Sequence, residues 1–227
     1  MELTGQYRTT EDLPGVIPVF PLGGAVLLPR CQLPLNIFEP RYLKMIDDAL
    51  RGNRIIGMVQ PDGDEAIAAA RMSDTRPKLC KVGGAGRLTS FAETGDGRLL
   101  ITLTGIARFE IRRELDTLTP YRQCEVDWAP YAEDLIAGYG GEEVSRERLL
   151  EILRDYLDTH GLQADWRTIK ASGNEMLVNS LSMVSPYGPR EKQALLEAKT
   201  LEDRNQMLIA ITEQALAQLS QSDTPVQ

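Results

Sequence analysis

The spacing of hydrophobic and polar residues changes once along the chain, near residue 129, and divides it into a β-rich part and a helical part. In the first part, short apolar runs alternate with polar residues or stop at prolines and glycines, as β-strands do. Proline has no N–H to give to a sheet, so strands before residue 40 should be short, bulged or at an edge. The predicted strands are residues 16–22, 25–28, 33–38, 54–60, 79–93, 99–112 and 121–128.

The strand that follows the turn at residues 95–97 has the clearest alternation. It is longer than the usual strand of about five or six residues. We therefore expect it to bend at Gly105 and to serve two parts of a closed, barrel-like sheet, with Leu103 and Phe109 buried. The residues on its hydrophobic side are Leu99, Ile101, Leu103, Gly105, Ala107, Phe109 and Ile111.

One short helix is predicted inside the β-rich part, over residues 40–51. Pro40 suits a first helical turn, and Gly52 suits the position just after the last one. The stretch 61–78 reads as a loop, in which an alanine-rich centre would form one weak helical turn at most.

Apolar residues recur at helical spacing in the second part of the chain. One predicted helix ends at Gly161, and Asn174 is the predicted cap of the next. Pro189 can open a third helix, and Thr200 with Asp203 approximates the capping box of the last one.

These patterns predict an α+β fold in two lobes. A mostly antiparallel, barrel-like β lobe with one short helix is expected over residues 15–129, followed by a linker at 130–141 and a helical-bundle lobe at 142–219. The polar ends, residues 1–14 and 220–227, are expected to be flexible tails.

Several of these segments resemble the Lon N-terminal, substrate-binding domain family. The segments are PVFPLGGAVLLP, LPLNIFEPRYLKMIDDAL, GMVQ, the hairpin VGGAGRLTSFAETGDGRLLITLTGIARFEI and the helical NSLSMVSPYGPREKQALLEAKTLEDR. Together they cover nearly the whole chain, and the likeness is looser between residues 130 and 169. In Lon proteases this domain precedes the ATPase and protease domains, and it also occurs alone in small bacterial proteins. The resemblance implies a PUA-like β lobe and a stand-alone module that binds exposed segments of client proteins or docks on a protease or another partner.

The composition narrows the classes of partner. The 227 residues carry a formal net charge of −8, which argues against nucleic-acid binding because phosphate contacts require a basic face. There is no signal peptide and no apolar run near the about 18 residues of a membrane helix, so we expect a cytoplasmic protein that binds no membrane. The three cysteines form no C-x-x-C pair, which indicates neither a disulfide framework nor a zinc site.

The sequence offers little catalytic chemistry. No lysine follows a glycine, so a P-loop is missing. The only histidine, His160, precedes a helix-ending glycine, where its partial positive charge suits the helix dipole. Lys170 and Ser172 are two positions apart and do not face each other on a helix. We therefore assign no catalytic, cofactor-binding or metal-binding residue.

Aromatic residues give the better functional lead, since aromatics often anchor partner peptides. The candidate partner-binding surface consists of Phe91, Trp128, Tyr131, Tyr139 and Tyr187. The residues interpreted as structural are Pro21, Phe38, Glu39, Pro40, Arg41, Tyr42 and Gly105. Among these, Phe38 is expected to close its strand onto the core, and Arg41 to pair with an acidic neighbour.

Two alternative functions remain open from the sequence. One is a small uncharacterised enzyme, which a pocket holding a carboxylate with a strongly shifted pKa would support. The other is an RNA-binding module of the PUA-like type. It would need a contiguous basic face built from Arg87, Arg98, Arg108 and Arg112.

Overall fold

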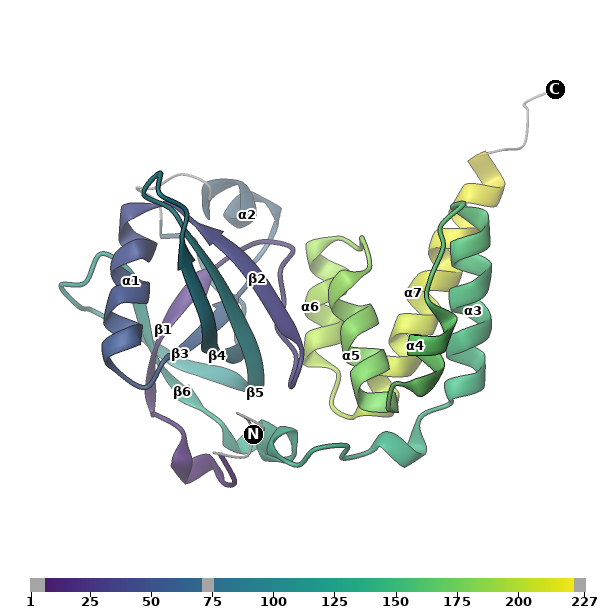
Figure 1. Cartoon of the computed structure of the whole chain (residues 1–227), viewed down its shortest axis with the longest axis horizontal. Coiled ribbons are helices and arrows are strands. Elements are labelled where there is room, and N and C mark those ends of the chain that lie inside the picture. The colour runs from purple at the N-terminus through teal and green to yellow at the C-terminus, as the bar shows by residue number, and fades with distance from the viewer. Residues whose placement is uncertain (1–6, 71–75, 223–227) are drawn as a thin grey trace. The chain divides into compact units, whose positions relative to one another are not determined.

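The computed structural model describes residues 7–70 and 76–222, and these form two compact units (Figure 1). The first unit runs to residue 137 and takes in residues 186–196, and the second takes in residues 138–185 and continues from residue 197. This division differs from the expected domains in two places. Residues 186–196 belong to the β-rich unit rather than to the helical lobe, and so does most of the expected linker, residues 130–137.

One curled sheet forms the first unit. Its strands are β1 (Val16–Pro21), β2 (Gln32–Ile37), β3 (Ile55–Val59), β4 (Val82–Glu93), β5 (Leu99–Leu115) and β6 (Arg122–Asp127). Their order is β2-β5-β4-β3-β1-β6, and β6 also pairs with β5, so that five strands close into a ring with β2 outside it. Among the strand pairings of the described residues, the β1–β3 pairing alone is parallel. The predicted barrel-like, mostly antiparallel sheet is therefore confirmed.

The long strand β5 serves two parts of this sheet, as its length predicted. Its first half pairs with β2 and its second half with β6, while β4 runs beside both halves. The β4–β5 register shifts where Gly86 pairs with Gly105 and Ala85 pairs with Ala107, which leaves Ile106 as a bulge beside the predicted bend. Leu103 and Phe109 are fully buried, so the inward face of β5 is the expected one.

Two glycines let the chain before β2 cross the barrel closely. A Cβ added at Gly84 would lie 1.8 Å from the Leu27 carbonyl oxygen, and one at Gly105 would lie 2.0 Å from that of Leu28. The Gly105 N–H donates to the Cys31 carbonyl at 2.8 Å. The expected strand at 25–28 is thus a buried crossing segment and not a strand, and the glycines mark close backbone approach.

The helix predicted in this unit is present as α1 (Pro40–Arg51), with Pro40 in its first turn and Gly52 as its C-cap. It buries a face towards the barrel that consists of Tyr42, Met45, Ile46 and Ala49. A second helix, α2 (Asp64–Ala70), replaces the weak turn expected in the loop. Short 3-10 helices span Thr10–Asp12 (η2) and Ala129–Leu135 (η3).

The N-terminal segment is not a flexible tail over the residues that the structure describes. Tyr7 and Leu13 are buried in the same hydrophobic cluster as Phe109. The sequence did not reveal that this segment is packed, because most of its residues are polar and only two of its apolar side chains reach the core. Residues 1–6 of the expected tail lie outside the described residues.

Helix α6 spans Pro189–Glu197, and its residues up to 196 belong to the first unit. Two glutamine side chains join this helix to the barrel. Buried Gln60 donates from Nε2 to the Pro189 carbonyl at 2.9 Å, and its Oε1 accepts the Gly24 N–H at 2.7 Å. Gln193 in turn donates to the Val82 carbonyl at 3.1 Å. The two bonds to α6, from Gln60 to Pro189 and from Gln193 to Val82, join residues more than 100 positions apart, so helical periodicity could not reveal which unit the helix belongs to.

The second unit is a helical bundle. It contains η4 (Gly141–Glu143), α3 (Arg146–Thr159), α4 (Trp166–Ala171), α5 (Asn174–Val184) and α7 (Leu201–Ser222). Helix α7 packs on α3 and α5, and buried positions include Leu149, Ile152, Leu177, Val178, Leu208 and Ile209. With the barrel, this bundle confirms the α+β class. Helix α7 continues to Ser222, so residues 220–222 are helix rather than tail, and residues 223–227 lie outside the described residues.

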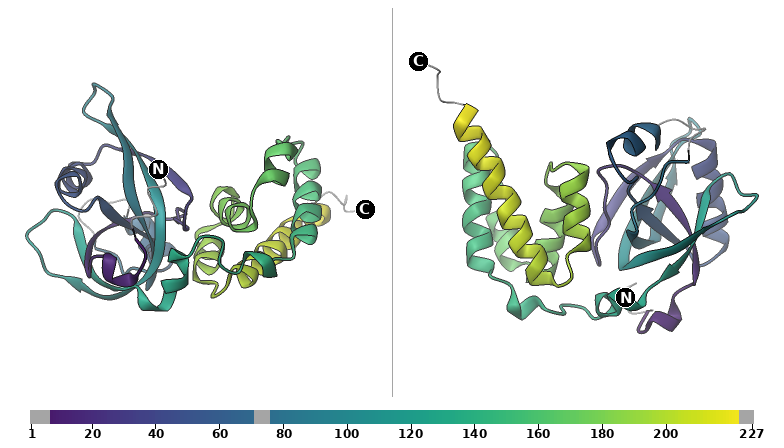
Figure 2. Two further views of the ribbon diagram at one scale, coloured as in Figure 1. Left: turned by 60° about the horizontal axis from the view of Figure 1, so that its bottom comes forward. Right: turned by 180° about the vertical axis from the view of Figure 1, so that it is seen from behind.

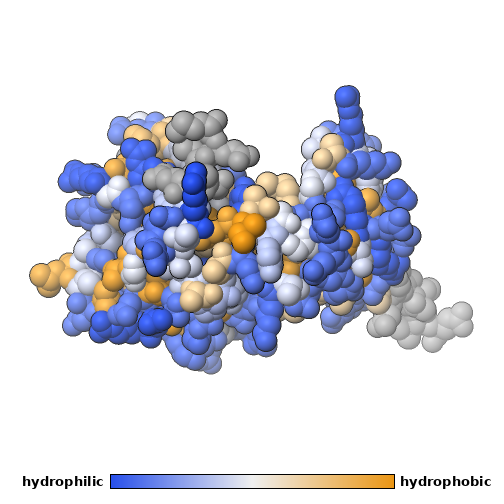
Figure 3. Space-filling view, turned by 90° about the horizontal axis from the view of Figure 1, so that it is seen from below, coloured by the Kyte–Doolittle hydropathy of each residue, from blue (hydrophilic) through white to orange (hydrophobic). Residues whose placement is uncertain are grey.

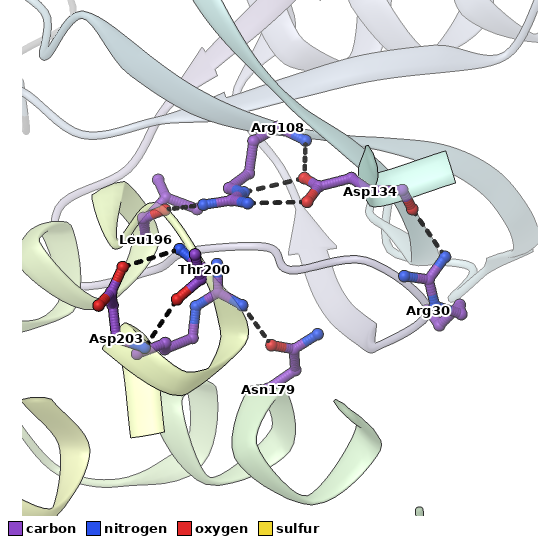
Figure 4. A network of polar contacts seen from close by, with 8 residues as sticks. Arg30, Arg108, Asp134, Asn179, Leu196, Thr200 and Asp203 are labelled. Atoms are coloured by element: carbon purple, nitrogen blue, oxygen red, sulfur yellow. Dashed lines mark hydrogen bonds and ion pairs between the residues drawn. The ribbon is translucent and has the colours of Figure 1, made fainter. Parts of the chain in front are cut away.

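Two capping predictions in this unit had different outcomes. The Thr200 hydroxyl accepts the Asp203 N–H at 3.0 Å and the Asp203 carboxylate accepts the Thr200 N–H at 3.2 Å, so the capping box is confirmed (Figure 4). The Asn174 cap is wrong, because Gly173 occupies the cap position. The Asn174 side chain instead accepts a hydrogen bond from Arg146 at 2.6 Å and donates one to the Gly141 carbonyl at 2.8 Å.

Candidate functional site

Trp128, expected at a binding surface, lies in the core. It is 5% exposed, its ring meets Phe109 edge-on at 5.6 Å between centroids, and its Nε1 donates to the Pro14 carbonyl at 2.9 Å. The alternation of β6 explains this, because Cys124 and Val126 point inward and Trp128 is the next residue in that series. The assignment of Trp128 to a partner surface is therefore wrong.

Tyr131 covers a buried ion pair. The Arg108 guanidinium lies over its ring at 4.2 Å and donates to both carboxylate oxygens of Asp134, at 2.9 and 2.8 Å. Figure 4 shows the same guanidinium reaching the Leu196 carbonyl, at 3.1 Å. Tyr131 is half-buried and has a structural role in this cluster.

The remaining predicted aromatics are divided between the two units. Tyr139 is exposed and belongs to the second unit, whereas Phe91 is exposed on β4 of the first unit. Tyr187 is half-buried in the segment that precedes α6. Of the five candidates, Phe91 and Tyr139 are the exposed ones, and they lie in different units.

The motif Phe38–Tyr42 joins β2 to α1, and its geometry corrects one expectation. Phe38 is 60% exposed and does not close the strand onto the core, because the preceding residue, Ile37, takes the inward position. The predicted ion pair of Arg41 is confirmed, with Nη2 2.8 Å from the Glu39 carboxylate. Tyr42 is buried, and its ring lies 4.1 Å from that of Phe20.

Phe38 is part of a solvent-facing surface on the three strands β2, β5 and β4, which we call the β2–β5–β4 outer face. Residues paired across strands point to the same side of a sheet. Pairing aligns Pro34 with Thr102 and Thr102 with Ser90, and it aligns Asn36 with Leu100 and Leu100 with Ala92. Beyond these rows, the Arg98 guanidinium lies 5.8 Å from the Phe38 ring centroid, and the Thr94 N–H donates to the Arg98 carbonyl. The outer face consists of Pro34, Asn36, Phe38, Ser90, Ala92, Thr94, Arg98, Leu100 and Thr102.

Exposed apolar side chains gather at one end of this face. Leu100 is 49% exposed, although its neighbour Ile101 is buried on the other side of the sheet. Of the nine side chains, only Arg98 is charged. Arg98 also lies 3.3 Å from the carboxylate of Asp96 in the turn. A hydrogen bond from the Thr94 hydroxyl helps to hold the pKa of Asp96 below its usual value. Figure 2 shows the β4–β5 hairpin extending past the rest of its unit.

Other hydrophobic residues are also exposed, among them Val16, Ile136 and Leu162. The face drawn in Figure 3 is mostly polar and shows hydrophobic residues as small separate groups. Leu118, in the loop between β5 and β6, is fully exposed and lies among polar neighbours in sequence. Single exposed apolar residues of this kind are normal and need no functional explanation.

Two residues with catalytic potential, His160 and Ser172, make local contacts within their own helical segments. His160 stacks on Tyr156 at 4.1 Å, and the Ser172 hydroxyl donates to the Thr168 carbonyl at 2.9 Å. Within residues 7–70 and 76–222, no cluster of three histidine, cysteine or acidic residues could hold a metal ion. In those same residues, no helix is long and apolar enough to span a bilayer.

The basic face required by an RNA-binding function is also not formed by the four arginines considered. Arg108 is buried against Asp134, and Arg112 pairs with Asp127 at 2.9 Å. Arg87 donates to the Tyr7 hydroxyl at 2.8 Å. The burial of Arg108 therefore removes one of the four arginines from any such face.

Comparison with proteins of known sequence gives several partial relatives. The chain is 31% identical over 114 residues to the Lon protease of Desulfosudis oleivorans, which is 50% of this chain and 13% of that protein. It is 26% identical over 206 residues to Lon protease 2 of Sorangium cellulosum, covering 86% of this chain and 24% of that protein. The chain thus spans about a quarter or less of the length of these relatives.

Solved structures share the fold. The Lon N-terminal domain protein from Xanthomonas campestris aligns with a TM-score of 0.60 at 23% identity, covering 86% of this chain and 97% of that one. The N-terminal domain of the Mycobacterium avium complex Lon protease aligns with a TM-score of 0.63 at 17% identity, covering 87% and 98%. Residues 16–214 match the family of ATP-dependent protease La (LON) substrate-binding domains. The chain therefore belongs to this family of Lon substrate-binding domains.

Proposed function

We propose that this chain is a non-catalytic polypeptide-recognition module that binds exposed, partly hydrophobic segments of client proteins. The observation that carries the proposal is the family match, which includes both the barrel and the helical bundle. The family is named for substrate binding, and we infer that the same activity resides in residues 16–214 of this chain. We place this activity in the cytoplasm.

The arrangement of reactive groups supports a binding role over an enzymatic one. Nucleophilic catalysis needs a nucleophile within hydrogen-bonding reach of a base. The Ser172 hydroxyl donates to a backbone carbonyl, and the Nδ1 of His160 lies 2.8 Å from the Tyr156 carbonyl. Neither side chain is paired with the other parts of a catalytic triad. The burial of Arg108, which takes it out of the basic face considered for RNA, and the net charge of −8 likewise favour a protein ligand over RNA.

An equilibrium titration tests the proposal. A fluorescent, reduced and alkylated protein that cannot fold is titrated with the chain, and the same protein in its native state is the control. We expect saturable binding of the unfolded form with a dissociation constant of roughly micromolar or weaker, because a single module lacks the avidity of an assembly. In parallel, the chain should neither hydrolyse ATP nor cleave casein.

Two results would contradict the proposal. Equal affinity for the native and unfolded forms would show non-specific adhesion. No binding at high protein concentration would favour a dedicated docking role on one folded partner instead.

A further inference from the structure

Phe38 and Leu100 are two large apolar side chains that the fold leaves on one side of the sheet. Their neighbours in sequence, Ile37 and Ile101, fill the core, so burial of the strands does not require Phe38 and Leu100 to be apolar. A polar residue at either position would leave the inward packing unchanged. Adjacent exposed apolar residues on a sheet face are a recognised feature of interaction sites.

The rows beside them are small and uncharged. Ser90 and Ala92 on β4 and Thr102 on β5 offer short side chains that leave room for a segment lying across the strands. None of the nine side chains of the outer face is a carboxylate, although the whole chain carries 33 acidic residues. An approaching polypeptide therefore meets no acidic side chain among these nine.

Arg98 gives this face a positive charge. Its guanidinium lies near the Phe38 ring, which keeps the charge beside the apolar pair. The ion pair that it forms with Asp96 is exposed on both sides, and such pairs are weak and readily exchanged. A carboxylate from a partner can therefore compete for Arg98 while an apolar side chain contacts Phe38.

The sheet edge is a poorer site than the face. Strand β2 pairs with β5 alone, so it is an edge strand, but Pro34 at its centre has no N–H for an added strand. We propose that the β2–β5–β4 outer face binds an extended polypeptide segment. In this arrangement an aromatic or aliphatic side chain of the segment packs on Phe38 and Leu100, and an acidic side chain lies beside Arg98. This inference rests on the proposed function and assigns it a surface and a preferred ligand.

Two labelled peptides test the assignment by fluorescence anisotropy. Both contain the same phenylalanine and leucine residues in a threonine- and serine-rich background, and they differ only in carrying glutamate or lysine beside the phenylalanine. The wild-type chain should prefer the glutamate peptide, and its preference should decrease with salt. Arg98→Glu should reverse the order of the two peptides.

Variants of the apolar pair complete the test. Phe38→Ser and Leu100→Ser should each weaken binding of the glutamate peptide by roughly 5- to 30-fold. Leu118→Ser removes an exposed leucine from another loop of the same unit and should leave the affinity unchanged. Circular dichroism and the urea midpoint verify that every variant is folded.

The outcomes separate the surface from the function. If wild type binds unfolded protein but Phe38→Ser, Leu100→Ser and Leu118→Ser all bind the peptide equally, the surface assignment is overturned and the proposed function stands. If wild type binds neither unfolded protein nor peptide, the proposed function fails. Concentration-dependent dimerisation that Phe38→Ser abolishes would assign the face to a second copy of the chain and overturn the peptide assignment.

Discussion

Arg108 of β5 and Asp134 of η3 form a buried, two-pronged ion pair. Nε and Nη2 of the arginine reach the two carboxylate oxygens at 2.9 and 2.8 Å, and the backbone N–H of Arg108 donates to the same carboxylate at 2.9 Å. Nη1 donates to the carbonyl of Leu196, near the end of α6. One arginine thus connects three segments of the first unit that are far apart in sequence.

Breaking this pair should be costly. Arg108→Ala or Asp134→Ala should lower the free energy of unfolding by about 3–5 kcal/mol, because the remaining charge stays buried without its partner. Replacing both by apolar residues, Arg108→Met with Asp134→Leu, should cost less than either single change. Urea denaturation measures this, and Arg112→Ala, which breaks an exposed pair, is the control with a loss of at most about 1 kcal/mol. Equal losses for Arg108→Ala and Arg112→Ala would contradict the buried assignment.

Phe109→Ala should destabilise the chain by about 3–5 kcal/mol, since its ring is fully buried against Trp128. Phe91→Ala removes an equal volume from an exposed position of β4 and should change the free energy of unfolding by about 0.5 kcal/mol or less. Comparing the urea midpoints of the two variants with that of the wild type tests which residues face the core. Similar midpoints would show that the inward and outward faces of the sheet are misassigned.

Gly105→Ala should disrupt the crossing segment, because the new methyl group would lie 2.0 Å from the Leu28 carbonyl oxygen. We expect poor expression, or a free energy of unfolding that is lower by about 1–3 kcal/mol or more, because a backbone carbonyl cannot easily move away from the added methyl group. Gly15→Ala, where no atom lies within 4 Å of the added Cβ, should be tolerated. Thermal unfolding of the two variants compares them, and a stable Gly105→Ala protein would refute the close approach.

Tyr121 should make stability depend on pH at the alkaline end. Burial and then the hydrogen bond to Asp48 raise its pKa to about 12 from 10.0. Because the folded pKa is the higher one, the contribution is complete below pH 10 and is lost as the pH rises towards 12. Tyr121→Phe should remove this part of the pH dependence, measured as unfolding free energy between pH 9 and pH 11.5. An unchanged alkaline slope would contradict the assignment.

The sequence predicted what depends on local periodicity. Alternation identified the inward face of β5, and the prolines and glycines marked the ends of α1 correctly. The motif argument misplaced Phe38, because a strand alternates through to its end and Ile37 already filled the core. Trp128 was misplaced for the converse reason: it continues an inward series just past the end of β6.

The long-range contacts could not be predicted from the sequence. Nothing local to α6 indicates that Gln193 meets Val82 or that Arg108 meets Leu196, so the helix was grouped with its neighbours in sequence. The candidate surface was missed for a related reason. It combines residues of β2, β4 and β5, and only the pairing register brings Asn36, Leu100 and Ala92 into one row.

Amide NMR of the ¹⁵N-labelled chain, titrated with an unfolded polypeptide that contains the phenylalanine–glutamate segment, tests the central claim of polypeptide recognition most directly. We expect saturable shifts of one common affinity at Asn36, Phe38, Ala92, Arg98 and Leu100, with the core residues Leu103 and Phe109 little changed. A spectrum that stays unchanged at high polypeptide concentration would contradict the claim that this chain recognises polypeptides.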